Sequence, residues 1–193
     1  MMNEPSILNK KLGEPLNRKE QKELGKLFEE LYLDALSRRR YQRLPMPHYM
    51  LQNVTATFLR MFGYDADFEV SFNAGSGFDT ERIRFDVVAE KGKKALIVEV
   101  KDKISTRDFC QLQGYFRSLR KSRVKADLYL CTDVINYTKL VSGTTGDMCC
   151  ELMENEKVRI MFADKYFLII CHTHSQLMLT EMPEFLTSEK VVV

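Results

Sequence analysis

Two acidic residues and a lysine stand in a segment that otherwise has the composition of buried β-strands. Asp86 lies in one apolar run, Glu99 and Lys101 lie in the next, and the four residues 91–94 separate the two runs. This pattern predicts a β-hairpin. If the four residues form its loop, Asp86 falls directly opposite Glu99. Lys101, two residues beyond Glu99, would project from the same face of the hairpin.

Two carboxylates and an amine on one face suit a metal-dependent hydrolytic site. Carboxylates whose Cβ atoms are about 5 Å apart repel one another unless a cation lies between them, and oxygen-only ligands favour Mg²⁺ or Mn²⁺. Such a cation lowers the pKa of bound water, and a neighbouring lysine can hold that water near a phosphate. The pattern therefore predicts phosphodiester hydrolysis. The alternative interpretation is a surface cluster of ion pairs.

Hydrophobic periodicity and capping signals predict the elements that would position these residues. A helix is expected over Asn17–Arg40, with Asn17 and Glu20 as a capping box, and a second over Tyr49–Met61. A third helix is expected to begin after Ser105. The expected strands are Ala66–Phe72, Ile83–Glu90, Ala95–Lys101, Ala126–Thr132, Val158–Phe162 and Tyr166–His172, and Asp133–Val141 is expected to be helical. The order α-α-β-β-β-α-β predicts a mixed α/β fold with helices covering a central sheet.

Asp86, twelve intervening residues and then Glu99-Val100-Lys101 resemble the core signature of the PD-(D/E)XK nuclease superfamily. Gly25-Lys26-Leu27-Phe28-Glu29 resembles the GxxFE element of Mrr-type restriction endonucleases and archaeal Holliday-junction resolvases. Gln111-Leu112-Gln113-Gly114-Tyr115 resembles the QhxxY motif of RecB-type exonucleases. Phe85 replaces the name-giving proline, and Glu29 replaces the RecB-type histidine.

The resemblance covers roughly residues 16–133. It implies a restriction-endonuclease-like α-β-β-β-α-β core within a single domain of residues 1–193, with residues 134–193 as a C-terminal extension.

The resemblance also implies a role for each matching residue. Asp86 and Glu99 would bind the metal together with the main-chain carbonyl of Val100, and Glu29 would bind it through a water molecule. Lys101 would orient the attacking water. The expected catalytic residues are thus Glu29, Asp86, Glu99, Lys101 and Gln111.

Two of these assignments have a plainer alternative. Glu29 fits an ordinary solvated helix position, because it lies at the edge of the apolar stripe. Gln111 and Tyr115 fit polar positions beside a stripe that packs into the core.

The net charge of +2 conceals an uneven distribution. Residues 91–125 carry 11 basic and 3 acidic side chains, whereas residues 126–193 carry 5 basic and 10 acidic ones. A basic block that contains Lys101 is expected to lie along a phosphate backbone, with a solubilising face as the alternative. The residues expected to contact DNA are Tyr115, Arg117, Arg120, Lys121, Arg123, Arg39 and Arg40.

The remaining features indicate a globular protein of a reducing compartment. The chain has 193 residues, of which 45% are hydrophobic, and five cysteines without a CxxC pair. We expect reduced thiols and a cytoplasmic protein, without a signal peptide, a membrane segment or an organic cofactor. His172 and His174 would share a strand face, but a zinc site there is not the favoured interpretation. His48 is interpreted as a loop histidine, with DNA contact as the alternative.

The sequence therefore predicts a Mg²⁺-dependent deoxyribonuclease that uses activated water, with endonuclease and exonuclease action both open. One alternative is a resolvase that acts on branched DNA as a homodimer. Another is a nuclease-fold module that binds DNA or assembles with partners without catalysis.

Overall fold

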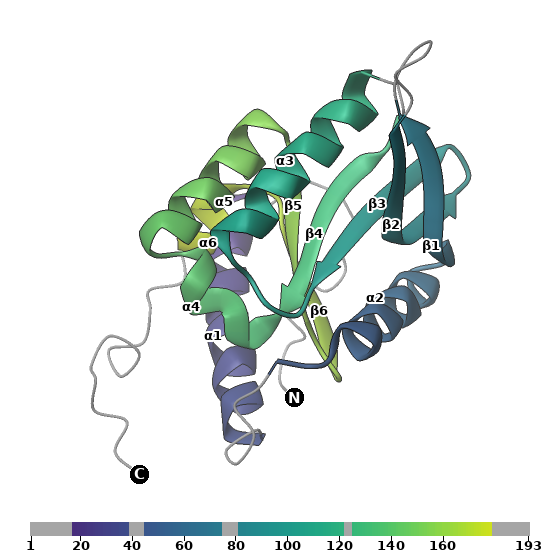
Figure 1. The fold of residues 1–193 in the computed structure, drawn as a ribbon. Coiled ribbons are helices and arrows are strands. Elements are labelled where there is room, and N and C mark those ends of the chain that lie inside the picture. Colours follow the sequence, from purple (N-terminus) through teal and green to yellow (C-terminus); the bar gives the residue numbers. More distant parts are fainter. Residues whose placement is uncertain (1–16, 39–44, 75–80, 122–124, 179–193) are drawn as a thin grey trace.

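A mixed sheet forms the centre of the protein, and its strands follow one another in chain order (Figure 1). The computed structural model describes residues 17–38, 45–74, 81–121 and 125–178. Within these ranges the sheet has six strands, of which β3, β4 and β5 are parallel while the outer pairs are antiparallel. The strands are β1 (Asp65–Ala74), β2 (Glu81–Lys91), β3 (Lys94–Lys101), β4 (Asp127–Asp133), β5 (Arg159–Asp164) and β6 (Phe167–Cys171).

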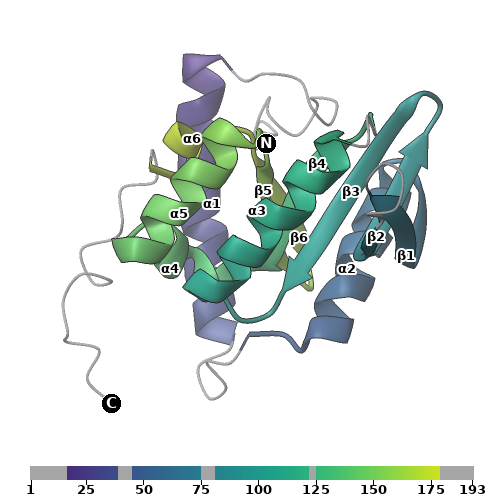
Figure 2. The same cartoon turned by 45° about the horizontal axis from the view of Figure 1, so that its top comes forward.

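Helices cover both faces of the sheet (Figure 2). Side chains of α2 pack with one hydrophobic cluster on one face, and the other helices pack with a second cluster on the opposite face. In the described part of the chain, no helix combines the length and the apolar character needed to cross a membrane. The helices are α1 (Arg18–Arg38), α2 (His48–Met61), α3 (Thr106–Lys121), the 3₁₀ turn η2 (Val134–Asn136), α4 (Tyr137–Leu140), α5 (Gly143–Asn155) and α6 (His174–Met178).

The expected order of elements is confirmed, and each expected strand lies within two residues of its predicted bounds. The capping box of α1 is also confirmed. Asn17 Oδ1 accepts from the Glu20 N–H at 3.0 Å, and Glu20 Oε2 accepts from the Asn17 N–H at 2.7 Å. Two helices were not predicted, α5 and α6. In α5, Gly143 and Gly146 are poor helix formers, so the local signal is weak and packing against α3, α4 and α6 maintains the helix.

The hairpin of β2 and β3 has the predicted register, with Glu90 opposite Ala95. Its turn is shorter than expected, because the strands still pair at the ends of the predicted four-residue loop. Gly92 takes a φ of +61° in that turn, a conformation that glycine adopts without steric penalty. At the other end the ladder stops with Val87 opposite Val98. The ladder therefore ends one pair before the expected pairing of Asp86 with Glu99.

The side chains of β2 switch from one face of the sheet to the other where the ladder stops. Phe85 belongs to the cluster under α3, whereas Val87, two residues later, belongs to the cluster under α2. Alternate residues of a regular strand share a face, so the backbone must twist at the residue between them, Asp86. On the neighbouring strand β1, Glu69 adopts a left-handed φ of 52° at the matching position. The twist places Asp86 at the gap between two separating strands.

A buried aspartate at the end of β4 fixes the segment that leads into α2. Asp133 is 0% exposed, and its Oδ2 accepts a hydrogen bond from the Met46 N–H at 2.6 Å. Its Oδ1 accepts from the Ile135 N–H at 3.1 Å and so caps η2. The carboxylate thereby positions the start of α2 relative to the strand ends.

Replacement of Asp133 by Ala is expected to lower the free energy of unfolding by about 2–3 kcal/mol, because two N–H groups lose their partner. Asp127, at the other end of β4, is exposed and paired with Arg159, so Asp127→Ala is a matched control with an expected loss of about 0.5 kcal/mol. Urea unfolding measures both values. Equal small losses in the two variants would contradict the anchoring role.

Candidate functional site

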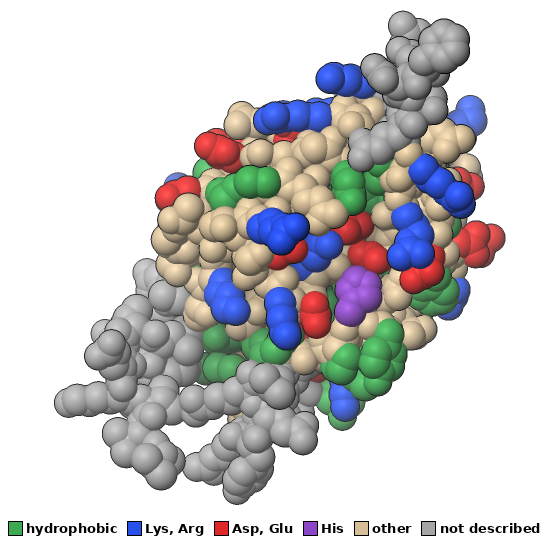
Figure 3. All heavy atoms as spheres, viewed as in Figure 1, with side chains coloured by type: hydrophobic (Ala, Val, Ile, Leu, Met, Phe, Trp, Pro, Cys, Tyr) green, Lys and Arg blue, Asp and Glu red, His purple; other side chains and the backbone are tan. Residues whose placement is uncertain are grey.

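The gap between β2 and β3 brings Asp86, Glu99 and Lys101 together. Lys101 Nζ lies 3.0 Å from Glu99 Oε1, and the charge of Asp86 acts on both groups. The Glu99 side chain is only 6% exposed, and that of Lys101 is 19% exposed. Figure 3 shows acidic and basic side chains beside a histidine over this part of the molecule. Two carboxylates and one ammonium group thus share a largely buried space with an opening to solvent.

Hydrogen bonds to Asp86 replace the ladder where the strands part. Asp86 Oδ2 accepts from the Val100 N–H at 2.7 Å, so a side chain takes the place of a strand partner. Gln52, buried on α2, donates from Nε2 to the Asp86 main-chain carbonyl at 2.7 Å. Buried main-chain groups need such partners, and these two contacts let β2 and β3 separate without losing them.

The electrostatics of the site are governed by the burial of Glu99. The pKa of Glu99 is raised to about 7, first by burial and then by the charge of Asp86, while Lys101 partly opposes the shift. Burial lowers the pKa of Lys101, but its interaction with Glu99 outweighs this and raises the pKa overall. The lysine is therefore a cation at neutral pH.

One carboxylate oxygen in the site has no hydrogen-bond partner. Among the buried side chains that the structure describes, Glu99 Oε2 alone lacks one. An unpaired buried oxygen beside a second carboxylate fits a hard divalent cation such as Mg²⁺ or Mn²⁺, which prefers oxygen ligands. Asp86, Glu99 and the main chain of Val100 are the groups that could hold it.

His48 belongs to this site, although the sequence favoured a loop residue. It is the first residue of α2, and its Nε2 lies 3.2 Å from Asp86 Oδ1. Asp86 thus has one oxygen facing His48 and the other bonded to Val100. The two residues are 38 positions apart, and only the packing of α2 beside β2 brings them together. The only local sequence signal for this placement was the pair Pro47-His48, because it marks the start of a helix.

The expected role of Glu29, metal binding through a water molecule, stays a prediction. The helix that carries Glu29, α1, packs against η2 and α6. No hydrogen bond or ion pair of the described residues joins Glu29 to Asp86, Glu99 or Lys101. The helix next to the hairpin is α2, which enters the site through His48.

Gln111 and Tyr115 lie one turn apart on α3 and contact each other. Gln111 Nε2 donates to the Tyr115 hydroxyl at 2.6 Å. The Tyr115 ring meets the Phe85 ring edge-on, with the centroids 6.2 Å apart, and Phe85 immediately precedes Asp86. The pair therefore supports the strand that carries Asp86, while Gln111 remains exposed.

The basic residues of α3 do not adjoin the carboxylates as expected. Because α3 runs back along β3, its last turn lies over the start of β4, where Asp127 pairs with Leu96, and Lys101 is at the other end. Arg120 lines a depression of about 250 Å³ there, with Lys125, Lys157 and Arg159. Lys121 is exposed on the same turn.

The other residues expected to contact DNA divide into two groups. Arg117 is engaged in an ion pair, with Nε 2.7 Å from Glu156 Oε1. Arg39, Arg40 and Arg123 lie outside the described residues.

Comparisons with known proteins yield two solved structures. Neither a scan against protein-family models nor a search of curated proteins gives a match. An XisH family protein from Nostoc punctiforme is similar over 60% of this chain and 91% of its own, with 18% identity and a TM-score of 0.44. An fdxN element excision controlling factor protein from Anabaena variabilis is similar over 64% of this chain and 98% of its own, with 19% identity and a TM-score of 0.47.

Proposed function

We propose that this protein is a metal-dependent nuclease of the PD-(D/E)XK type, which hydrolyses phosphodiester bonds of DNA by attack of an activated water. The observation that carries the proposal is the unpaired, buried Glu99 Oε2 beside Asp86, with Lys101 3.0 Å from the other Glu99 oxygen. If these residues served only stability, the fold would be more stable with fewer buried like charges. A cation at this position resolves the imbalance.

The residues of the site have two proposed roles, binding the metal and orienting the groups around it. Asp86 and Glu99, with the Val100 carbonyl, would hold Mg²⁺ or Mn²⁺, which supplies positive charge at the phosphate and acidifies bound water. Lys101 stays protonated and can donate a hydrogen bond to the attacking water. His48 and the Val100 N–H hold the two oxygens of Asp86 in place. The geometry is fixed by the protein before substrate binds, as preorganised catalysis requires.

The distant basic depression supports a polymeric substrate. From Thr106 to Arg120 the α3 helix rises about 21 Å. That length corresponds to roughly six base pairs of duplex DNA at 3.4 Å per pair. A small phosphodiester bound at the carboxylates would not reach Arg120 or Lys125, whereas a duplex that follows α3 would contact both.

Loss of either acid is expected to abolish cleavage. Asp86→Asn and Glu99→Gln should each lower the Mg²⁺-dependent cleavage rate at least about 1,000-fold, because a lost metal ligand removes several kcal/mol of transition-state stabilisation. Plasmid, linear duplex, single-stranded and four-way-junction DNA are tested with Mg²⁺ and with Mn²⁺. The matched control is Glu90→Gln, which changes an exposed acid on β2, the strand that carries Asp86. This variant should cut DNA like wild type. Absence of cleavage of every DNA by the wild type would refute the proposal.

Lys101→Ala should separate catalysis from metal binding. The rate should fall about 100- to 10,000-fold, the range for loss of a group that positions or protonates a reactant. The rise in Tm caused by Mg²⁺ should remain, because both carboxylates are intact. Lys103→Ala, which changes an exposed neighbour, should affect neither quantity. If Lys101→Ala cleaves at the wild-type rate, the lysine has no part in the chemistry.

The raised pKa of Glu99 predicts a pH-dependent stability without metal. Its folded-state pKa of about 7 lies above the ordinary value of 4.5, so the folded state binds more protons between these limits. The contribution of Glu99 to stability is therefore present at low pH and lost as the pH rises to 7. The stabilisation of Glu99→Gln over wild type is the difference between their free energies of unfolding, measured in urea with EDTA present. This difference should be about 2–3 kcal/mol larger at pH 8 than at pH 4. A difference that does not change with pH would contradict this account.

A further inference from the structure

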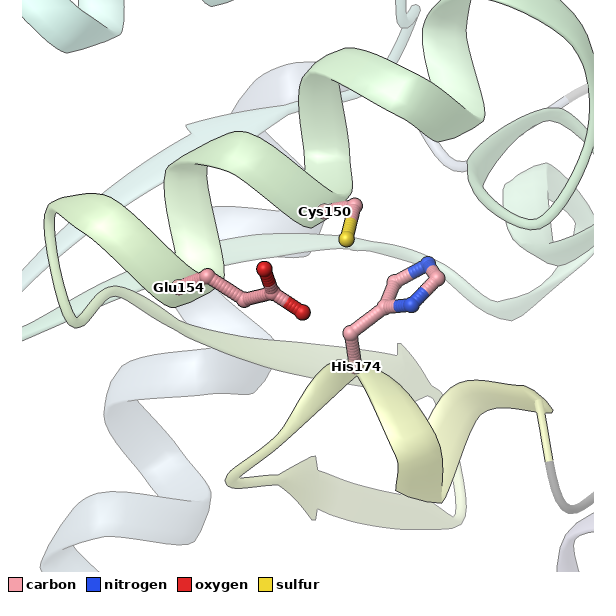
Figure 4. A group of neighbouring side chains, drawn as sticks. All are labelled: Cys150, Glu154 and His174. Atoms are coloured by element: carbon pink, nitrogen blue, oxygen red, sulfur yellow. The ribbon is translucent and has the colours of Figure 1, made fainter.

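A second group of metal-ligating side chains lies on the opposite half of the molecule. Cys150 and Glu154 of α5 and His174 of α6 each offer one ligand atom, and these atoms all lie within 4.8 Å of one another. Figure 4 shows the sulfur, the carboxylate and the imidazole turned toward the same space. The sequence did not predict this group, since His174 was expected on a strand with His172. In the structure β6 ends at Cys171 and His174 begins a helix.

Local structure fixes the three side chains relative to one another. Cys150 and Glu154 are four residues apart on α5 and therefore lie on the same side of that helix. Gln176 is buried, and its Oε1 accepts from the Thr173 N–H at 3.1 Å, which holds the turn before His174. The Tyr137 hydroxyl donates to the Leu177 carbonyl at 2.7 Å and attaches α6 to α4. The histidine is thus presented to α5 by a well-anchored element.

The three ligand types differ from those of the nuclease site. A thiol and an imidazole favour Zn²⁺ and related transition metals, whereas Mg²⁺ takes oxygen ligands. Zinc accepts Cys, His and Glu at about 2.0–2.3 Å, so atoms that share one ion lie roughly 3.5 Å apart. Small rotamer changes of Cys150 and Glu154 would close the observed spacing, because neither side chain is fully buried.

The surroundings of the thiol also favour a cation. Asp147, Glu151 and Glu154 all place negative charge at Cys150. Among the charges of described residues that shift the pKa of Cys150, none belongs to a Lys or an Arg. A divalent ion would offset this local excess of acid.

We infer that Cys150, Glu154 and His174 form a zinc site with one open position, independent of the nuclease site. The ion would join α6 to α5 and so stabilise the last described helix of the chain. Three protein ligands leave a fourth position for water or for a ligand from elsewhere.

Cobalt spectroscopy on the untagged full-length chain tests the inference. Co²⁺ in a tetrahedral thiolate site gives a sulfur-to-metal charge-transfer band, which an oxygen-only site cannot give. After treatment with EDTA, the protein is titrated with Co²⁺ in excess Mg²⁺, and Zn²⁺ is then added in competition. We expect one Co²⁺ per chain with a thiolate band, displaced by Zn²⁺. The Tm should rise with Zn²⁺ in the wild type.

Matched variants assign the band to named residues. Cys150→Ser and His174→Gln should each weaken Zn²⁺ binding at least about 100-fold, and the exposed Glu154→Gln about 10-fold. Cys110→Ser removes an exposed thiol on α3 and should leave binding unchanged, as should Asp86→Asn. Circular dichroism verifies the fold of each variant, and Glu154→Gln keeps the test informative if a partly buried variant unfolds.

Three results would overturn the zinc site. The first is a titration without a thiolate band. The second is a band that persists at full strength in Cys150→Ser. The third is a band lost in Cys110→Ser or Asp86→Asn, because the metal would then be bound elsewhere.

Discussion

The hydrogen bond from the Val100 N–H to Asp86 is the interaction on which the candidate site depends. Two antiparallel strands that separate inside a protein leave main-chain groups without partners, which is unfavourable in a buried environment. Here a carboxylate accepts one of those N–H groups at 2.7 Å, and Gln52 donates to the carbonyl of the same aspartate. The separation makes room for Glu99 and Lys101 beneath Asp86.

The same arrangement sets stability against function. Glu99 is nearly enclosed, lies in the field of Asp86, and has one oxygen without a partner. Lys101 balances only one of the two negative charges. A buried, partly satisfied polar group usually destabilises a fold, so its presence at a strand gap indicates a site shaped for something that is bound there. The raised pKa of Glu99 and the proposed affinity for a divalent cation are two consequences of one electrostatic imbalance.

Local patterns predicted most of the fold but only part of the candidate site. The hairpin register followed from alternation and turn composition, and the α1 cap followed from Asn17 and Glu20, because both depend on residues close in sequence. The end of the ladder at Asp86 did not follow, since it requires a twist and a partner on α2. His48 was interpreted as a loop residue for the same reason. Choosing between two amphipathic helices needs tertiary packing, which spacing does not contain.

The sequence also did not indicate where the basic residues of α3 lie relative to the carboxylates. Residues 91–125 are strongly basic as a block, but α3 carries its last basic turn to the far end of the sheet. Proximity in sequence therefore became separation in space. The reverse holds for Cys150 and His174, which are distant in sequence and adjacent in the structure. Oxygen ligands between β2 and β3 and a thiol with an imidazole between α5 and α6 select different ions, so the two proposed sites need not compete for one metal.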